Sequence, residues 1–395
     1  MSLLKQAASV TAMNLRSIPE RRGTAIVAVV GIAGVVAVLI GIFSINEGFR
    51  AVLELSGSDE VAIVLRGGGT DEMTSGLSQE QTRIIGDAAG VLREGGTPVS
   101  SAELYVLVDV PLKGTGTPAN VPLRGVGPFA PKLRQGFRLV EGRTFTPGTN
   151  EVIVGRGAAE QFVGLTVGSR LVQGTSVWNV VGVFADVGSV AESEIWSDAI
   201  VLQGAYNRGT SYQSTRVRLE NAAALQTFKD ALTSDPRVNV SVLTERQYYA
   251  QQARGLVALV TILGRAIAIL MGIAAIFGAL NTMYSAVSSR AKEIATLRAI
   301  GFGAFPVVTS VLVEALALGL VGGAIGGLIA YFGFNGLRAS TMNISSFSQI
   351  TFAFTVTPAL LVQSLLYAPV LGFAGGLMPS LRAARLPITI GLRDS

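Results

Sequence analysis

The longest uncharged segment of this sequence decides what kind of chain it is. Thr24 to Asn46 form a run of 23 residues without a charged side chain. As a helix, such a run is long enough to cross a hydrocarbon core of about 30 Å. Three further apolar stretches follow, one interrupted only by Arg265 and the next only by Glu314. We therefore expect a membrane protein with four transmembrane helices, at 23–46, 255–286, 304–337 and 357–379.

The positive charges lie beside the ends of these stretches. Residues 47–254 hold 19 Lys/Arg against 22 Asp/Glu, whereas the rest of the chain holds 12 against 4. Basic residues mark the cytoplasmic ends of membrane helices. We therefore expect 1–22, 287–303 and 380–395 in the cytoplasm, with both termini inside, and a large domain at 47–254 and a short loop at 338–356 outside. The basic residues concerned are Lys5, Arg16, Arg21, Arg22, Arg290, Lys292, Arg298, Arg382, Arg385 and Arg393.

The missing residue types exclude several functions. The chain has no histidine and no cysteine, which removes Cys/His metal sites, Ser-His-Asp and Cys-His catalysis, haem ligation and disulfides. The net charge of +5 follows the membrane topology, so we expect no nucleic-acid partner. The first span is longer than a signal-peptide core of about 7–15 residues, and no A-x-A site follows it; an uncleaved anchor is expected. Residues 3–18 predict an amphipathic helix on the inner membrane surface, with a frayed terminus as the alternative.

The outer segment has the composition of a globular α+β domain. A short strand at 61–65 and a helix that begins with a capping box at Ser78–Gln81 open it. Beyond a stretch rich in proline and glycine, strand-like runs follow one another. A mixed pattern returns at 215–243. We therefore expect a mixed αβ subdomain interrupted by a β-rich subdomain at about 113–210.

No combination of residues in this domain predicts catalysis. Gly67–Gly69 lacks the spacing of a nucleotide-binding loop and predicts a turn. Three carboxylate pairs offer groups for a cation or for acid–base work, but without a cleft to hold them we expect solvated turns. We expect Trp178 and Trp196 in the core. The carboxylate pairs are Asp59/Glu60, Asp71/Glu72 and Glu192/Glu194.

The segment between the second and third apolar stretches carries the most specific motif. It reads Asn281-Thr-Met-Tyr-Ser-Ala-Val-Ser-Ser-Arg-Ala-Lys-Glu-Ile-Ala-Thr-Leu-Arg-Ala-Ile-Gly301 and resembles the cytoplasmic motif of MacB/FtsX-type ABC transporter permeases. The resemblance covers essentially the whole chain. It implies the type VII, mechanotransmission-like architecture in the bacterial inner membrane: one span, a periplasmic core domain, then three spans. Further matching segments are Glu141–Arg143, Glu151–Val154, Trp178–Val183, Pro379–Ile388 and Gly391–Arg393.

The resemblance also implies an ATPase. A Walker A loop needs Gly-Lys-Ser/Thr so that its lysine reaches the phosphates, and none of the five lysines follows a glycine. Unlike fused members of the family, this chain is expected to have no ATPase domain and no cofactor of its own. ATP and Mg²⁺ are expected on a separate ABC ATPase subunit, present in two copies.

We predict the contact with that subunit at a cytoplasmic coupling helix within 287–303. As a helix, this segment sets an apolar ridge inside a charged rim, a form that suits a groove on another protein. A helix lying passively at the lipid headgroups is the alternative. The ridge is Ile294, Leu297 and Ile300, and the rim is Arg290, Lys292, Glu293 and Arg298.

Two features are expected within the spans. Glu314 lies about eight residues into the third span, roughly 12 Å by helix rise. An intramembrane carboxylate suggests a function by default, but we favour a structural role, bonded to polar groups such as Asn281, Tyr284 or Thr309. Glycines spaced by four predict close helix packing, with a dimer contact as the alternative; they are Gly319, Gly323, Gly327, Gly372 and Gly376.

The expected function is that of the membrane subunit of an ABC exporter. It would work beside a second copy or a paralogous permease in membrane lipid, with a periplasmic adaptor (membrane fusion) protein as a further candidate partner. Polar stretches that continue the first two spans, 47–55 and 245–254, predict a stalk that moves the outer domain as a lever. Two alternatives are an FtsX-like regulator of a cell-wall hydrolase and Lol-like lipoprotein or lipid extraction.

Overall fold

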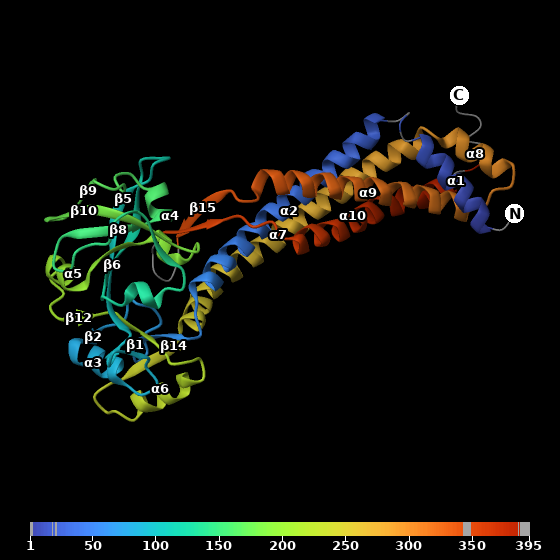
Figure 1. The fold of residues 1–395 in the computed structure, drawn as a ribbon. Helices are drawn as coiled ribbons and strands as arrows, with labels where there is room; N and C mark the ends of the chain where they lie inside the picture. Colours follow the sequence, from blue (N-terminus) through green and yellow to red (C-terminus); the bar gives the residue numbers. More distant parts are fainter. Residues whose placement is uncertain (1–2, 18, 20–21, 343–348, 386, 388–395) are drawn as a thin grey trace. The chain divides into compact units, whose positions relative to one another are not determined.

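The computed structural model describes residues 3–17, 19, 22–342, 349–385 and 387, and these form two compact units (Figure 1). The helical unit comprises Met1–Glu47, Leu259–Leu337 and Phe354–Ser395, and the sheet domain comprises Gly48–Ala258 and Arg338–Ala353. The tail residue Arg393 lies outside the described residues.

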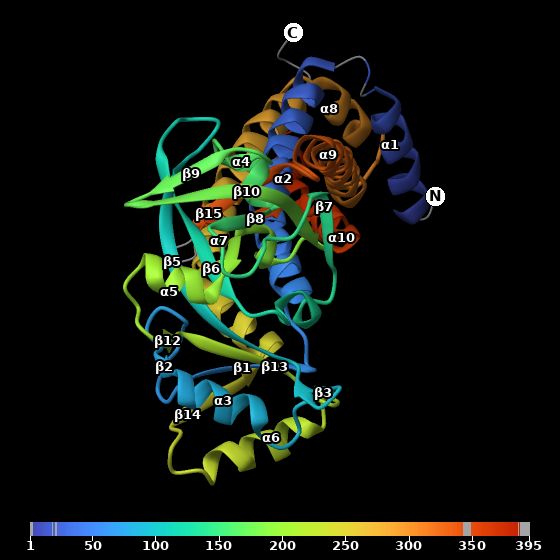
Figure 2. The same cartoon turned by 60° about the vertical axis from the view of Figure 1, so that its left-hand side comes forward.

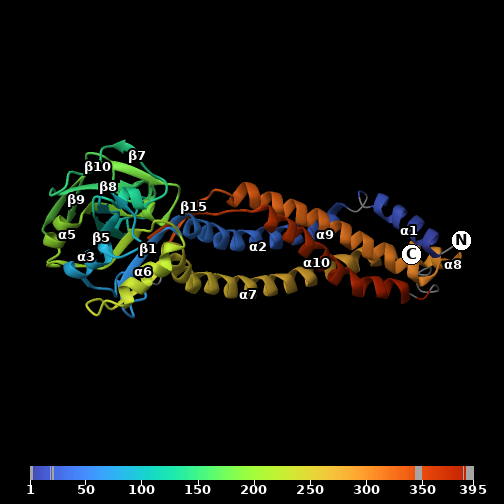
Figure 3. The ribbon, with the colours of Figure 1, turned by 60° about the horizontal axis from the view of Figure 1, so that its bottom comes forward.

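Among the residues that the structure describes, six α-helices contribute to the helical unit. Four of them are long and apolar enough to cross a membrane, which confirms the four-span prediction. Two of these, α2 and α7, continue into the sheet domain. Apolar side chains from α2, α7, α8, α9 and α10 share one core, and α9 and α10 lie side by side (Figure 3). The helices are α1 (Leu3–Ser17), α2 (Arg22–Ser56), α7 (Glu245–Ser288), α8 (Ala291–Ala299), α9 (Ala304–Phe334) and α10 (Pro358–Arg385).

The helix predicted at 3–18 is present as α1. Its Val10 and Asn14 side chains are buried, and the Asn14 amide donates to Ser310 Oγ on α9. Leu3 and Leu4 are exposed apolar residues on the same helix. This segment therefore packs against α9 through one face and leaves apolar side chains free on another.

A mixed ten-stranded sheet forms the sheet domain (Figure 2). Most neighbours are antiparallel, but β10–β8 and β11–β6 are parallel. In spatial order the strands are β14 (Val240–Thr244), β1 (Val61–Arg66), β13 (Ser214–Arg218), β5 (Ser100–Pro111), β6 (Pro118–Val126), β11 (Ile195–Asp198), β8 (Glu151–Gly155), β10 (Ser176–Asp186) and β7 (Phe137–Gly142), with β9 (Arg170–Gln173) on β10.

Two of the apolar cores on this one sheet are covered by helices. One packs α3 (Gln79–Asp87) and α6 (Ala224–Thr233) against β1 and β13. The other packs α4 (Arg156–Gln161) and α5 (Ala199–Ala205) against β5, β6, β8 and β10. The two halves separated in the sequence analysis are therefore joined along β5, whose first residues pair with β13 and whose later residues pair with β6. The reciprocal capping box at Ser78 and Gln81 and the burial of both tryptophans are confirmed.

Short elements complete the domain. They are β2 (Leu77–Ser78), β3 (Arg93–Glu94), β4 (Thr97–Pro98), η2 (Ala130–Leu133), η3 (Val190–Ser193) and β12 (Ser211–Tyr212). The segment expected as a loop at 338–356 instead contains a hairpin of β15 (Arg338–Met342) and β16 (Gln349–Ala353). Its β-branched and aromatic residues suit strands. Phe352 packs edge-on against Phe49 of α2 at 6.0 Å.

Candidate functional site: buried charges at the start of α7

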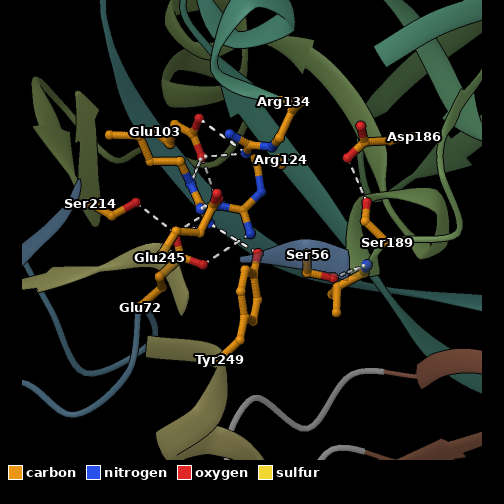
Figure 4. A network of polar contacts seen from close by, with 12 residues as sticks. Ser56, Glu72, Glu103, Arg124, Arg134, Asp186, Ser189, Ser214, Glu245 and Tyr249 are labelled. Atoms are coloured by element: carbon orange, nitrogen blue, oxygen red, sulfur yellow. Dashed lines mark hydrogen bonds and ion pairs between the residues drawn. The ribbon is translucent and has the colours of Figure 1, made fainter. Parts of the chain in front are cut away.

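Seven ionisable side chains lie together inside the sheet domain, and we call them the charge network. Figure 4 labels five of them: Glu72, Glu103, Arg124, Arg134 and Glu245. Each of the seven is buried, with at most 8% of the residue exposed. Buried charges are rare in proteins unless they are paired. The members are Glu72, Glu103, Arg124, Arg134, Glu194, Arg216 and Glu245.

The strand register explains why three of these charges meet. Side chains alternate between the two faces of a strand, and Glu103 lies on β5 where its pairing changes from β13 to β6. Arg124 lies opposite Tyr105, and Arg216 lies opposite Ser101. All of these residues therefore face one side of the sheet, whereas the alternate residues of β5, such as Leu104, enter the apolar core.

Arg124 uses all of its guanidinium donors. Nε and Nη2 donate to the two oxygens of Glu194, each at 2.8 Å. Nη1 and Nη2 donate to the two oxygens of Glu72 at 2.7 and 2.9 Å, and Nη1 also donates to Glu103 at 2.9 Å. Bidentate pairs of this kind are among the strongest and most directional polar contacts. One arginine on β6 thus fixes three carboxylates from three separate segments.

Arg216 connects the charge network to α7. Its Nε donates to Glu103 at 3.0 Å, its Nη1 donates to Glu245, and its Nη2 lies 3.5 Å from the hydroxyl of Tyr249. Glu245 is the first residue of α7, and Tyr249 follows one turn later. The start of the helix is therefore held inside the domain by two buried side chains.

The end of α2 is fixed in the same domain. Ser56 Oγ, in the last position of α2, accepts from the Val190 backbone N–H of η3 at 2.7 Å. Beyond it, Gly57 lies so close to α7 that an added Cβ would meet Arg246 Cα at 2.5 Å. Both helices that continue from the helical unit therefore end in close, buried contacts within the sheet domain.

Burial and the neighbouring arginines act on the pKa values of these carboxyl groups in opposite directions. Burial alone raises the pKa of Glu72, but Arg124 and Arg216 outweigh it and lower the pKa to about 2. The pKa of Glu103 is also lowered, because three arginines outweigh its burial. At Glu245, burial outweighs the attraction of Arg216 and raises the pKa. Four carboxyl groups face three guanidinium groups, so one carboxyl is the natural holder of a proton.

This arrangement is suited to holding elements together. Every carboxylate of the charge network already accepts from an arginine. Within the described part of the chain, there is no group of three or more Asp or Glu residues placed to hold a metal ion. The site fixes the start of α7 to the sheet through buried ion pairs.

The expectation of solvated carboxylate pairs is wrong for two of the three pairs. Asp59 and Glu60 are exposed, but Asp71/Glu72 and Glu192/Glu194 are buried. The partners of Glu72 and Glu194 come from strands about 50 to 140 residues away, so neighbouring sequence does not show them. One feature of the sequence could have indicated buried charges: Arg124 and Arg216 each lie within a strand-like run, at a position that faces the interior.

The predicted coupling segment folds as α8, but two of its seven candidate contact residues are not available. Arg290 and Ile294 are buried inside the helical unit. Of the predicted apolar ridge, Ile294 is therefore turned into the helical unit. Ile300, just after α8, is 68% exposed. Lys292 and Glu293 are exposed, and Leu297 and Arg298 are half-buried.

Glu314 has a partner that the sequence analysis missed. Arg290 Nη2, at the turn between α7 and α8, donates to both carboxylate oxygens at 3.0 and 3.2 Å. The polar partners expected for Glu314 did not include this arginine. The pair is buried, and it ties the corner between α7 and α8 to α9.

Glycines on α9 and α10 lie where the two backbones approach. A Cβ on Gly319 would stand 2.8 Å from the Ala368 carbonyl oxygen, and a Cβ on Gly372 would stand 2.5 Å from that of Ala315. Gly323 and Gly376 face the side chains of the same two alanines, and Gly327 has looser contacts. Two further glycines, Gly322 and Gly326, pack against α2. The structure thus places these residues at contacts within one chain.

Comparison with known families assigns both halves of the chain. Residues 25–235 match the MacB-like periplasmic core domain, and residues 265–388 match the FtsX-like permease C-terminal domain. The first match covers more than half of the 395 residues, and the chain belongs to the MacB/FtsX family of ABC-type permeases. It is a multi-pass membrane protein with a MacB-like periplasmic core domain.

Two relatives illustrate the similarity. The macrolide export ATP-binding/permease protein MacB of Sodalis glossinidius (strain morsitans) is 25% identical over 95% of this chain and 59% of its own length. MacB 1/2 of Paracoccus denitrificans (strain Pd 1222) is 25% identical over 91% of this chain and 54% of its own length. The chain thus spans little more than half the length of these relatives, and what it matches are the core and permease domains.

Solved structures show a weaker likeness. The periplasmic region of MacB from Actinobacillus actinomycetemcomitans is 13% identical, with a TM-score of 0.38 over 48% of this chain and 91% of that one. The extracellular domain of the noncanonic ABC-type transporter YknZ from Gram-positive bacteria is 16% identical, with a TM-score of 0.33 over 47% of this chain and all of that one.

Proposed function

We propose that this chain is a permease subunit that converts ATP hydrolysis by a separate ABC ATPase into movement of its sheet domain. The observation that carries the proposal is α7. One unbroken helix begins at Glu245 inside the charge network and ends at Ser288, three residues before the cytoplasmic helix α8. A rigid element fixed at both ends passes on a displacement with little loss.

The position of the ATPase contact follows from what α8 leaves exposed. Of the seven candidate contact residues, Lys292, Glu293 and Ile300 are the exposed ones. The two ATPase copies would each bind one permease copy there, with ATP and Mg²⁺ on the ATPase. The basic residues beside the spans support a cytoplasmic location for this segment and for both termini.

The test is a pull-down of the ATPase with two matched variants. Ile300→Asp places a charge on the exposed contact and should abolish capture of the ATPase while the chain stays folded. Ile200→Asp, at an isoleucine of the sheet domain that is 71% exposed, should capture it normally. Retention of the ATPase by Ile300→Asp would contradict the assigned contact.

Export is the favoured use of this movement, because the named relatives are macrolide export proteins. The spans themselves offer a polar substrate little, since Glu314 is already paired with Arg290 and the surrounding residues are mostly apolar. Control of a cell-wall hydrolase and extraction of lipoprotein or lipid are the competing uses. Co-purification distinguishes them: an adaptor protein indicates export, a hydrolase indicates regulation, and acylated protein indicates extraction.

A further inference from the structure

A groove lies between the parts of α2 and α7 that belong to the sheet domain. It is lined by Arg50, Leu53, Glu54, Arg246, Ala250, Arg254 and Val257. Its volume is about 220 Å³, the space of about seven water molecules at roughly 30 Å³ each. A phosphate group with its nearest substituents fits such a space.

The groove combines positive charge with an apolar wall. Three of its residues are arginines and only one is acidic, and Leu53, Ala250 and Val257 supply the apolar contacts. Arg50 pairs with Glu54 at 3.5 Å and Arg246 pairs with Asp59 at 2.9 Å, in both cases between exposed side chains. Exposed pairs of this kind are weak, so an anion can replace them.

The position of the groove along α2 and α7 indicates which kind of anion it binds. The uncharged stretch of α7 begins at Gly255, so Arg254 directly precedes it and Val257, in the wall of the groove, lies within its first turn. On α2, Arg50 lies about 6 Å by helix rise beyond Asn46, where the uncharged run ends. Arginines at this depth lie at the level of lipid headgroups.

We propose that this groove binds the headgroup of an anionic phospholipid, with the phosphate between Arg246 and Arg254 over Ala250 and the glycerol and upper acyl chain against Val257. A lipid seated there lies between the two helices that enter the sheet domain, so membrane composition would set how easily they separate. The site depends on neither ATP nor the ATPase.

The test uses the absence of native cysteine. Ala250→Cys, in the groove, is compared with Gln251→Cys, exposed beside it and outside the lining. Each full-length variant is placed in nanodiscs of phosphatidylcholine, with or without phosphatidylglycerol, and labelled with uncharged N-ethylmaleimide. We expect phosphatidylglycerol to slow labelling of Ala250→Cys about fivefold or more and to leave Gln251→Cys unchanged.

Charge variants complete the test. Arg246→Gln with Arg254→Gln should remove the protection, because each arginine contributes about fivefold to affinity for an anionic surface. Arg83→Gln with Arg208→Gln, at exposed positions elsewhere in the domain, should keep it. The proposal is overturned if both cysteines are protected alike, or if inorganic phosphate alone protects Ala250→Cys. Protection in pure phosphatidylcholine would overturn it as well, because a second copy of the chain would then cover the groove.

Discussion

Arg216 on β13 donates to the carboxyl group of Glu245, the residue with which α7 begins. The contact joins the middle of a sheet to the end of a helix that is 44 residues long. Both side chains are buried, so water does not compete with the contact. Any movement of α7 along its axis must therefore move β13 or break a buried ion pair.

Breaking this pair should destabilise the sheet domain. Arg216→Met leaves Glu245 without its buried cation and removes one of the arginines that pair with Glu103, which should cost about 3–5 kcal/mol. Arg218→Gln, on the same strand but in an exposed pair with Glu60, should cost about 0–1 kcal/mol. Denaturant unfolding followed by tryptophan fluorescence measures this directly, because both tryptophans are buried in the sheet domain. Equal losses in the two variants would contradict the assigned role of the charge network.

Stability should depend on pH in two opposite ways. Because the pKa of Glu72 is lowered, its ionised carboxylate stabilises the folded state. This stabilisation is fully present above pH 4.5, the ordinary pKa of the group, and is lost as the pH falls toward about 2. The shift corresponds to about 3 kcal/mol, and Glu72→Gln should remove this pH dependence. The raised pKa of Glu245 acts in reverse: its contribution is fully present below 4.5 and is lost as pH rises through the raised value.

Glu245→Gln should therefore be at least as stable as the wild type above neutral pH, because glutamine keeps an acceptor for Arg216 without a charge. Glu220→Gln, at an exposed position, serves as the control and should change neither profile. Unfolding followed by fluorescence across the pH range gives the free energy of unfolding of Glu72→Gln, Glu245→Gln and Glu220→Gln. A Glu245→Gln protein that loses stability at high pH would show that the ionised carboxylate is needed.

Arg290 and Glu314, the buried ion pair of the helical unit, should depend on each other for their effect on stability. Glu314→Leu alone leaves Arg290 buried and unpaired, at a cost of about 3–5 kcal/mol, whereas Arg290→Met together with Glu314→Leu should recover most of the loss. Glu293→Leu, at an exposed position of α8, is the control. The measurement is the temperature at which half of the detergent-solubilised protein stays monodisperse. Additive losses in the double variant would argue against the pair.

The packing of α9 on α10 should tolerate no added methyl group at Gly319. A Cβ there meets a backbone oxygen at 2.8 Å, whereas one at Gly333 meets nothing within 4 Å. Gly319→Ala should cost about 1–3 kcal/mol. Gly333→Ala should be neutral or stabilising by up to about 1 kcal/mol, because alanine favours a helix. The same thermal measurement compares the two variants. Equal changes in the stability of Gly319→Ala and Gly333→Ala would contradict the close contact at Gly319.

The sequence predicts the membrane part of this protein better than its charge network. Uncharged runs and flanking arginines locate four helices because a hydrocarbon core imposes a length and a composition on each span locally. The meeting of Arg124 with Glu72 and Glu194 depends instead on strand order, which no local pattern states. The same limit applies to Arg290 and Glu314: both residues are visible in the sequence, but only the turn after α7 brings them together.

The central claim is that ATP moves the sheet domain through α7. Because the native chain has no cysteine, a spin label at Gln251→Cys reports one position on each copy of a reconstituted dimer with its ATPase. We predict that the distance distribution between the two labels shifts between the ATP-bound and ADP-bound complexes. A distribution that stays the same in both states, while the complex hydrolyses ATP at its normal rate, would contradict the account.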